Sequence, residues 1–432
     1  MKRGMIKMTE DKLNIKKTLL LSFGFFASSL AWSIYNSFVP QILEGFITST
    51  MGIGFIMTID NIFGVIFQPI FGGLSDRTRT RFGRRMPYIF IGIPICAAAF
   101  ALLPVMNSLW SLMAVLIVFT FVMSAWRSPV VALMPDITPG KFRSQANGIV
   151  NFMGGVGSLL AFAGGGLLFK VGGFPLPFLM SAVIMVAALL VLALFVREPG
   201  QSYQAYQAYQ SYEIEAESKA KAEKQSFKLT KGERNSLLLL LFAIFFWFTG
   251  YNAVETFFTL YATNALGMDG GSAAMTLSIF SLTFLIFAIP SGFIGAKIGR
   301  KKIIIIGLIG ITALFVPLIF LSSAWAARIC LFFGGFFWAC VNINSLPMVV
   351  RLSGEDKFGT FIGYYYFFSF TSQIISPILF GFIRDIAGDY KILFLYSSVA
   401  FAAALGCIFF VRHGEEEPQA TNVTEILENL DD

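Results

Sequence analysis

Residues 72–85 read GGLSDRTRTRFGRR and lie between two long apolar segments. Five of the nine residues from Arg77 to Arg85 are arginines. Charged side chains are expensive in hydrocarbon, so a run of this kind does not fit the membrane core. We therefore predict a tight aqueous loop that joins two membrane spans. A weaker copy, GFIGAKIGRKK, recurs at residues 292–302.

The composition indicates an integral membrane protein. Of the 432 residues, 56% are hydrophobic and only 13% are charged, whereas a soluble domain has about one quarter charged residues. A membrane helix needs roughly 20 apolar residues, and long continuous apolar runs favour helices over a closed sheet. The expected spans are 18–43, 51–74, 86–104, 109–134, 146–169, 175–196, 236–263, 272–296, 303–322, 325–350, 358–383 and 390–411.

The distribution of positive charge predicts the topology. Of the 32 Lys and Arg residues, 27 fall in the N-terminus (1–17), the even-numbered loops and the tail (412–432). Cytoplasmic segments carry such an excess. We expect a multi-pass protein of the cell membrane with both termini in the cytoplasm.

A polar segment at residues 197–235 separates an N-terminal bundle, 18–196, from a C-terminal bundle, 236–411. The segment contains the low-complexity run QSYQAYQAYQSY, which is typical of a flexible linker. We predict a flexible cytoplasmic linker; a role in binding a partner is the alternative.

The two halves repeat each other at a nearly constant spacing. Tyr35-Asn36 returns as Tyr251-Asn252, Gly83-Arg84-Arg85 as Gly299-Arg300-Lys301, and Val196-Arg197 as Val411-Arg412, after 216, 216 and 215 positions. A constant offset across whole halves indicates duplication. Two related six-helix halves are a known plan of secondary transporters, so we predict an all-α membrane protein with twelve transmembrane helices in two pseudo-symmetric bundles.

Other classes of protein are not expected. The sequence has no Walker loop and no HExxH motif, which argues against an enzyme. The four cysteines, at scattered positions within spans, suggest neither disulfides nor a metal site. We expect no cofactor, no metal and no nucleic-acid partner, and a monomer in the lipid bilayer. A non-transporting sensor would carry a larger soluble domain.

The loop at 72–85 resembles the signature loop between helices 2 and 3 of the major facilitator superfamily. Its elongated RTRTRFGRR form is similar to the glycoside–pentoside–hexuronide:cation symporters, and most of all to their sucrose-transporter-like branch. The segment RSPVVALMPDITPGKFRSQANG at 127–148 supports that branch. The resemblance implies alternating access, import of a sugar or glycoside with a cation, and a central cavity lined by helices 1, 4, 7 and 10.

The sequence departs from both cation sites that the resemblance implies. The sucrose-like branch has an acidic residue where this chain has Leu116, and the melibiose-type branch has two carboxylates where it has Gly64 and Gln68. Asp60, close to the bilayer middle, is the obvious substitute, and Glu255 is the second candidate for proton coupling. With no cluster of hard oxygen ligands, a proton is favoured over sodium. The alternative for Asp60 is a structural hydrogen bond between helices.

Polar groups within the spans are the candidates for substrate binding. They are Tyr35, Asn36, Gln68, Arg127, Tyr251, Asn252, Asn344 and Gln373. The Arg127 guanidinium offers five donors to sugar hydroxyls or pairs with Asp60. Snorkelling of Arg127 and ordinary helix-to-helix hydrogen bonds are the alternatives.

A second set lies on the predicted cytoplasmic side, namely Asp76, Arg77, Gly83, Arg84, Arg85 and Asp136. The resemblance implies a charged latch that steadies one conformational state. Anchoring by the positive-inside rule is the alternative, although topology needs no Asp. In the second copy Ala296 replaces the first Asp, so any latch is asymmetric.

These observations favour proton-coupled symport of a di- or oligosaccharide or glycoside. Protonation of Asp60 would change its pairing with Arg127 and so bias the equilibrium between the two states. The alternative is a drug or organic-acid exchanger of the same fold.

Overall fold

The computed structural model describes residues 13–80, 82–138, 142–196, 198, 229–353 and 358–415. The Tyr-Gln-Ala repeat of the predicted linker and most of the predicted C-terminal tail lie outside the described residues.

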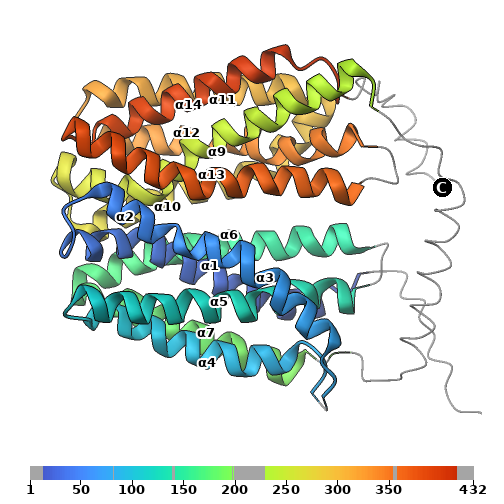
Figure 1. The fold of residues 1–432 in the computed structure, drawn as a ribbon, viewed down its shortest axis with the longest axis vertical. Coiled ribbons are helices and arrows are strands. Elements are labelled where there is room, and N and C mark those ends of the chain that lie inside the picture. The colour runs from blue at the N-terminus through green and yellow to red at the C-terminus, as the bar shows by residue number, and fades with distance from the viewer. Residues whose placement is uncertain are drawn as a thin grey trace, which may run out of the picture. The chain divides into compact units, whose positions relative to one another are not determined.

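The described chain is helical almost throughout (Figure 1). Its α-helices are α1 (Ile15–Glu44), α2 (Thr50–Met57), α3 (Ile59–Arg77), α4 (Met86–Leu102), α5 (Leu109–Ile137), α6 (Arg143–Gly172), α7 (Pro175–Phe195), α9 (Lys231–Leu266), α10 (Gly270–Ile298), α11 (Arg300–Phe320), α12 (Ala324–Arg351), α13 (Phe358–Ala387) and α14 (Ile392–Phe410). Within the described ranges, 12 helical segments are long and apolar enough to cross a membrane, with α2 and α3 forming one of them. The predicted fold class is confirmed.

The boundaries differ from the predicted ones at α9, which begins at Lys231 and not at 236. A capping box explains the earlier start. The Thr230 hydroxyl accepts from the Glu233 amide at 3.2 Å, and the Glu233 carboxylate accepts from the Thr230 amide at 2.8 Å. The box satisfies amides that would otherwise have no partner at the helix start.

The chain forms two compact units. The first takes in the described residues of Met1–Thr48, Phe55–Glu215 and Asp269–Ser278; the second takes in those of Ser49–Gly54, Ala216–Met268 and Ile279–Asp432. In the first unit α1 packs on α6 and α7, and in the second α9 packs on α13 and α14. The pairs α4–α5 and α4–α7 likewise have counterparts in α11–α12 and α11–α14. The duplication seen in the sequence therefore extends to helix packing.

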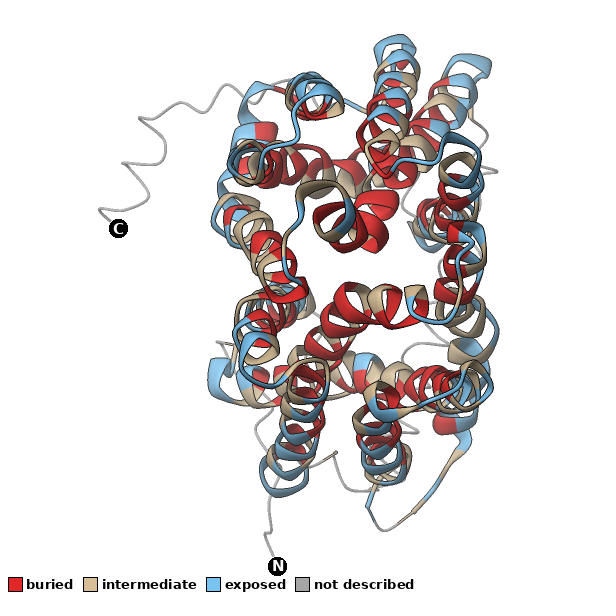
Figure 2. Ribbon diagram, turned by 90° about the vertical axis from the view of Figure 1, so that its left-hand side faces the viewer, coloured by how far each residue is buried: buried red, intermediate tan, exposed pale blue. Residues whose placement is uncertain are grey.

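Buried residues gather where the helices of one unit face one another, and exposed residues lie on the outer faces (Figure 2). Small residues allow the closest of these approaches. A Cβ on Gly157 of α6 would come within 2.4 Å of the Phe26 carbonyl oxygen on α1. Glycines of this kind let membrane helices pack backbone to backbone.

The start of α2 belongs to the second unit. The Asp385 carboxylate of α13 accepts hydrogen bonds from the Ser49 hydroxyl and the Thr50 amide, both at 2.7 Å, and from the Met51 amide at 3.0 Å. A carboxylate at a helix N-terminus is favoured by the free amides and the helix dipole. Asp385 thus fixes the beginning of α2 in the second unit. The chain, which left the first unit after Thr48, returns to it at Phe55.

Candidate functional site

Asp60 lies at a break in the second span. The amide and the hydroxyl of Thr58 both donate to the Phe55 carbonyl, at 3.1 and 2.7 Å. This tight turn ends α2 at Met57 and lets α3 begin at Ile59. Asp60 therefore falls in the first turn of α3, where the helix dipole favours a negative charge. The sequence predicted one unbroken span and missed this break.

Three helices of the first unit bring charged and polar groups to Asp60. The carboxylate accepts from the amide and side chain of Asn61, at 2.7 and 3.0 Å. It also interacts electrostatically with Tyr35 of α1 and Arg127 of α5. That Asp60 and Arg127 share one site stays a prediction, and Tyr35 is a further residue within electrostatic reach of Asp60.

Aromatic rings surround the Tyr35 side of this cluster. Trp32 meets Tyr35 edge to face, with ring centroids 5.4 Å apart. Phe119 of α5 lies 5.8 Å from Tyr35 and 5.7 Å from Trp32. Tyr35 is fully buried, and its hydroxyl has no hydrogen-bond partner among the described residues. Sequence reasoning missed Trp32, although it stands one helical turn before Tyr35.

Two further predicted residues of the first unit are half-buried. Asn36 lies next to Tyr35 on α1, and Gln68 lies two turns beyond Asp60 on α3. The Gln68 side chain covers Gly64, where a Cβ would stand 3.2 Å from the Gln68 amide nitrogen.

The second unit places an acidic residue beside a stacked aromatic pair. Tyr251 of α9 and Trp338 of α12 stack face to face, with centroids 4.3 Å apart and an interplanar angle of 2°. Glu255, one turn along α9, interacts electrostatically with Tyr251. Aromatic faces and a carboxylate together suit a cationic or flat amphipathic group.

Two predicted binding residues are engaged in helix packing. Asn252 is buried and donates to the Ser372 hydroxyl of α13 at 3.3 Å. Asn344 is buried and donates to the carbonyls of Ser291 on α10 and Cys340 on α12, at 3.2 and 3.0 Å. The alternative of ordinary helix-to-helix hydrogen bonding describes both residues. Gln373, also predicted, is half-buried on α13.

The charged loop closes around one carboxylate. Asp136, near the end of α5, accepts from Arg84 Nε at 3.2 Å and from Arg85 Nε at 2.9 Å. Arg85 also pairs with Asp76 and bonds the Ser75 hydroxyl. Arg77 is exposed at the end of α3. These ion pairs join α3, α5 and the α3–α4 loop within the first unit.

Glu198, which sequence reasoning missed, caps α4 from far along the chain. Its carboxylate accepts from the amides of Arg84, Arg85 and Met86, at 2.6, 2.7 and 2.9 Å. Gly83 makes room for it, since a Cβ there would meet the carboxylate at 2.4 Å. The repeated Val-Arg pair gave no signal for it, since the next residue is Glu198 in one half and His413 in the other.

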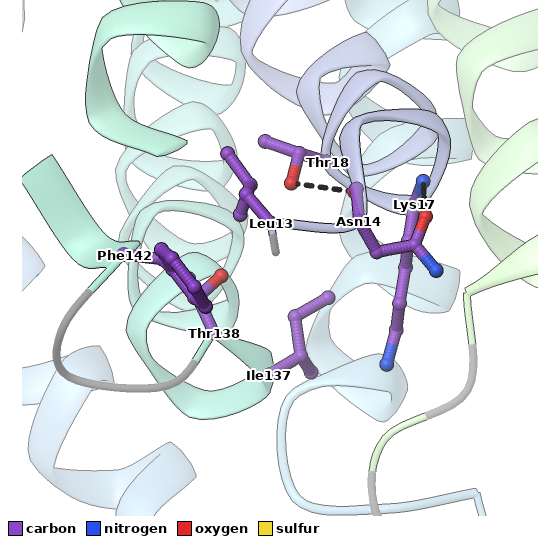
Figure 3. A pocket seen from close by; sticks show the side chains of 7 residues that line it. All are labelled: Leu13, Asn14, Lys17, Thr18, Ile137, Thr138 and Phe142. Carbon is purple, nitrogen blue, oxygen red and sulfur yellow. Dashed lines mark hydrogen bonds between the residues drawn. The ribbon is translucent and has the colours of Figure 1, made fainter. Parts of the chain in front are cut away.

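A small hollow lies where the beginning of α1 meets the end of α5 (Figure 3). Its polar lining already serves the start of α1. The Asn14 side chain accepts from the Lys17 amide, and its carbonyl accepts from the Thr18 hydroxyl, both at 3.0 Å. We assign it no binding role. Within the described ranges, no group of three or more His, Cys, Asp or Glu residues could hold a metal.

Comparisons with known proteins identify the family. Residues 21–277 and 240–429 match the model of the Major Facilitator Superfamily. Multidrug resistance protein MdtG of Enterobacter lignolyticus is 25% identical over 326 residues, which are 73% of each chain. Tetracycline resistance protein, class H, of Pasteurella multocida is 25% identical over 389 residues, which are 86% of this chain and 90% of the relative.

Solved structures share the fold. A D-xylose-proton symporter superposes with a TM-score of 0.69 at 15% identity, covering 93% of this chain and 99% of that one. A bacterial homolog of the human lysosomal transporter Spinster gives a TM-score of 0.66 at 13% identity, covering 91% and 93%. At these identities the likeness concerns the fold alone. The chain is a multi-pass membrane transporter and not an enzyme.

Proposed function

Because this chain belongs to the Major Facilitator Superfamily, we propose that it is a proton-coupled exchanger that exports drug-like organic molecules. This is the alternative function considered from the sequence, and the relatives named for multidrug and tetracycline resistance support it better than sugar symport. The observation that carries the coupling mechanism is the Asp60 carboxylate in a broken membrane helix, interacting with both Tyr35 and Arg127.

The mechanism follows from competition for Arg127. A deprotonated Asp60 attracts the guanidinium, whereas a protonated Asp60 leaves it free for another partner. A proton and a substrate would then favour different pairings of the same two helices, α3 and α5. Such differential binding is what any ligand needs to shift an equilibrium between two conformations. A proton entering from one side could thereby drive substrate out from the other.

Glu255 provides a second acidic group, in the second unit. Its carboxylate beside the Tyr251–Trp338 stack would attract a cationic group of the substrate. Aromatic stacking tolerates many ring systems because every such system has a flat face. This tolerance suits a transporter of several drugs better than the ordered hydroxyl recognition that a sugar requires.

Everted vesicles with an imposed pH gradient test the proposal directly. With an acidic lumen, wild-type protein should accumulate tetracycline or ethidium and release protons in exchange, so that the lumen becomes more alkaline when the drug is added. Asp60→Asn, which keeps the size but cannot titrate, should lose gradient-driven accumulation by at least tenfold. Asp389→Asn, the same substitution at an exposed position outside the site, is the matched control.

The competing function has its own readout. If sugars move protons in the same vesicles and drugs do not, the sugar symport predicted from the sequence is correct and drug exchange is wrong. If Asp60→Asn still couples drug to proton movement, Asp60 is not the coupling residue and Glu255→Gln becomes the decisive variant.

A further inference from the structure

Several side-chain atoms of the first unit are buried without a hydrogen-bond partner among the described residues, Trp126 Nε1 and Ser37 Oγ among them, and three donors of this kind are found on the faces of α1 and α5 that carry the candidate site. They are the Trp32 indole nitrogen Nε1, the Tyr35 hydroxyl and the Arg127 Nε, and none has a hydrogen-bond partner among the described residues. Buried polar groups in proteins almost always have partners, because an unmade hydrogen bond in a dry interior is costly. Three such donors in one region therefore point to an acceptor that is not part of the protein.

Two of the three donors are in direct contact, and the third shares an electrostatic partner with one of them. Trp32 contacts Tyr35 at 5.4 Å between ring centroids, and both rings contact Phe119. Tyr35 and Arg127 both interact electrostatically with Asp60. The donors come from α1 and α5, which pack against each other in the first unit.

The three groups act as hydrogen-bond donors and not as acceptors. An indole N–H and a guanidinium N–H can only donate, and the phenol is a donor when it faces an oxygen acceptor. Asp60 is already an acceptor for Asn61 through one of its oxygens. Flat rings of Trp32, Tyr35 and Phe119 provide the remaining surface. The matching ligand carries several acceptor oxygens along the edge of a flat ring system.

We infer that Trp32, Tyr35 and Arg127 form an oxygen-reading half-site in the first unit, which selects polyoxygenated aromatic or fused-ring substrates over lipophilic cations that lack acceptor atoms. This inference rests on the proposed function and narrows its substrate class. Trp32 is the specificity-determining residue it adds.

The test compares two drugs of opposite chemistry. Tetracycline has carbonyl and enol oxygens along one edge, whereas tetraphenylphosphonium has aromatic rings and no acceptor. Trp32→Phe and Tyr35→Phe keep the ring and remove the donor. Each should lower pH-driven tetracycline accumulation in everted vesicles by about three- to tenfold, the effect of one buried hydrogen bond. Tetraphenylphosphonium accumulation should change by less than twofold.

Trp126→Phe is the matched control. This tryptophan neighbours Arg127 in sequence but packs on Gly92 of α4, where a Cβ would stand 2.6 Å from it. The Trp126→Phe variant should not lower the accumulation of one drug more than that of the other. If Trp32→Phe and Tyr35→Phe reduce both drugs equally, or neither, while wild type transports both, the half-site is wrong and drug exchange stands.

Equilibrium binding of labelled tetracycline to the purified, full-length protein separates the two proposals. If wild type shows no gradient-driven transport but binds tetracycline, and Trp32→Phe weakens that binding three- to tenfold, drug exchange fails and the half-site stands. If wild-type protein neither binds nor transports tetracycline, the half-site is overturned.

Discussion

The loop between α3 and α4 and the loop between α10 and α11 share a backbone turn, but the cation that follows the turn has different partners in each. Gly83 and Gly299 both have positive φ, 107° and 104°, and each precedes the start of a helix. In the first loop Arg85 finds Asp136 and Asp76. In the second, Lys301 stands at the matching position and donates to the carbonyls of Phe409 and Val411, at 3.1 and 2.6 Å.

The difference shows how a duplicated turn can acquire two electrostatic roles. Where Asp76 has been replaced by Ala296, the cation binds the carbonyl end of α14, which carries the negative pole of the helix dipole. That partner is part of the backbone and cannot be gained or lost by titration. The first loop instead depends on carboxylates, which join three elements and can exchange partners. We therefore expect substitutions of charged residues to destabilise the protein more at the first loop than at the second.

Removing the shared carboxylate should have the largest effect. Asp136→Asn leaves Arg84 and the buried Arg85 without their common anion, and we expect about 2–4 kcal/mol of lost stability, near the low end for a broken buried ion pair. Thermal unfolding of the purified protein in detergent measures it. Lys301→Met, the corresponding loss in the second loop, should cost far less. Equal losses would contradict the asymmetry.

Adding a side chain at the two glycines should reveal where the loops are alike. Gly83→Ala and Gly299→Ala both force an L-residue into a positive φ, at about 1–3 kcal/mol each. A Cβ would also meet a carboxylate in each case, Glu198 or Glu415, at 2.4 Å. The two melting temperatures should therefore fall by similar amounts. A selective effect at Gly83 would mean that the turns differ in strain and not only in charge.

Deleting the distant caps should have a smaller and unequal effect. Glu198→Ala removes the acceptor of three amides at the start of α4, at about 1–2 kcal/mol, as for loss of a helix N-cap. Glu415→Ala removes a carboxylate near Gly299 and is expected to cost less. Hydrogen exchange at the first turns of α4 and α11 locates each loss. The expected order would be contradicted if Glu415→Ala speeds exchange at the first turn of α11 more than Glu198→Ala speeds it at the first turn of α4.

The sequence predicted the loop and its charged residues but not all of the groups that they bind. Arg84, Arg85, Asp76 and Asp136 follow from the motif, and the structure groups them. Glu198 was out of reach because its cap spans 112 residues from Met86, a separation at which local patterns say nothing. The same limit hid Trp32, whose importance depends on the rotation of α1 against α5.

Two candidate binding residues in the spans make hydrogen bonds to other helices in the structure. Asn252 and Asn344 have the polarity of binding residues, but their amides donate to Ser372 and Ser291 on neighbouring helices, and Asn344 also donates to Cys340 one turn earlier on its own helix. A polar residue in a membrane helix satisfies either a ligand or another helix. Only the identity of the facing helix separates the two roles.

By itself the sequence determined the membrane class, the spans, the duplication and the charged loop that named the superfamily. These properties depend on composition and on short-range patterns of apolar and charged residues, which act on each segment separately. Only the tertiary structure decided that the second span breaks at Thr58, that Tyr35 lies within electrostatic reach of Asp60, and that Lys301 beside the second loop binds a helix end in place of Asp136 and Asp76. Those outcomes depend on which helix faces turn toward each other, and residues far apart in the chain settle that together.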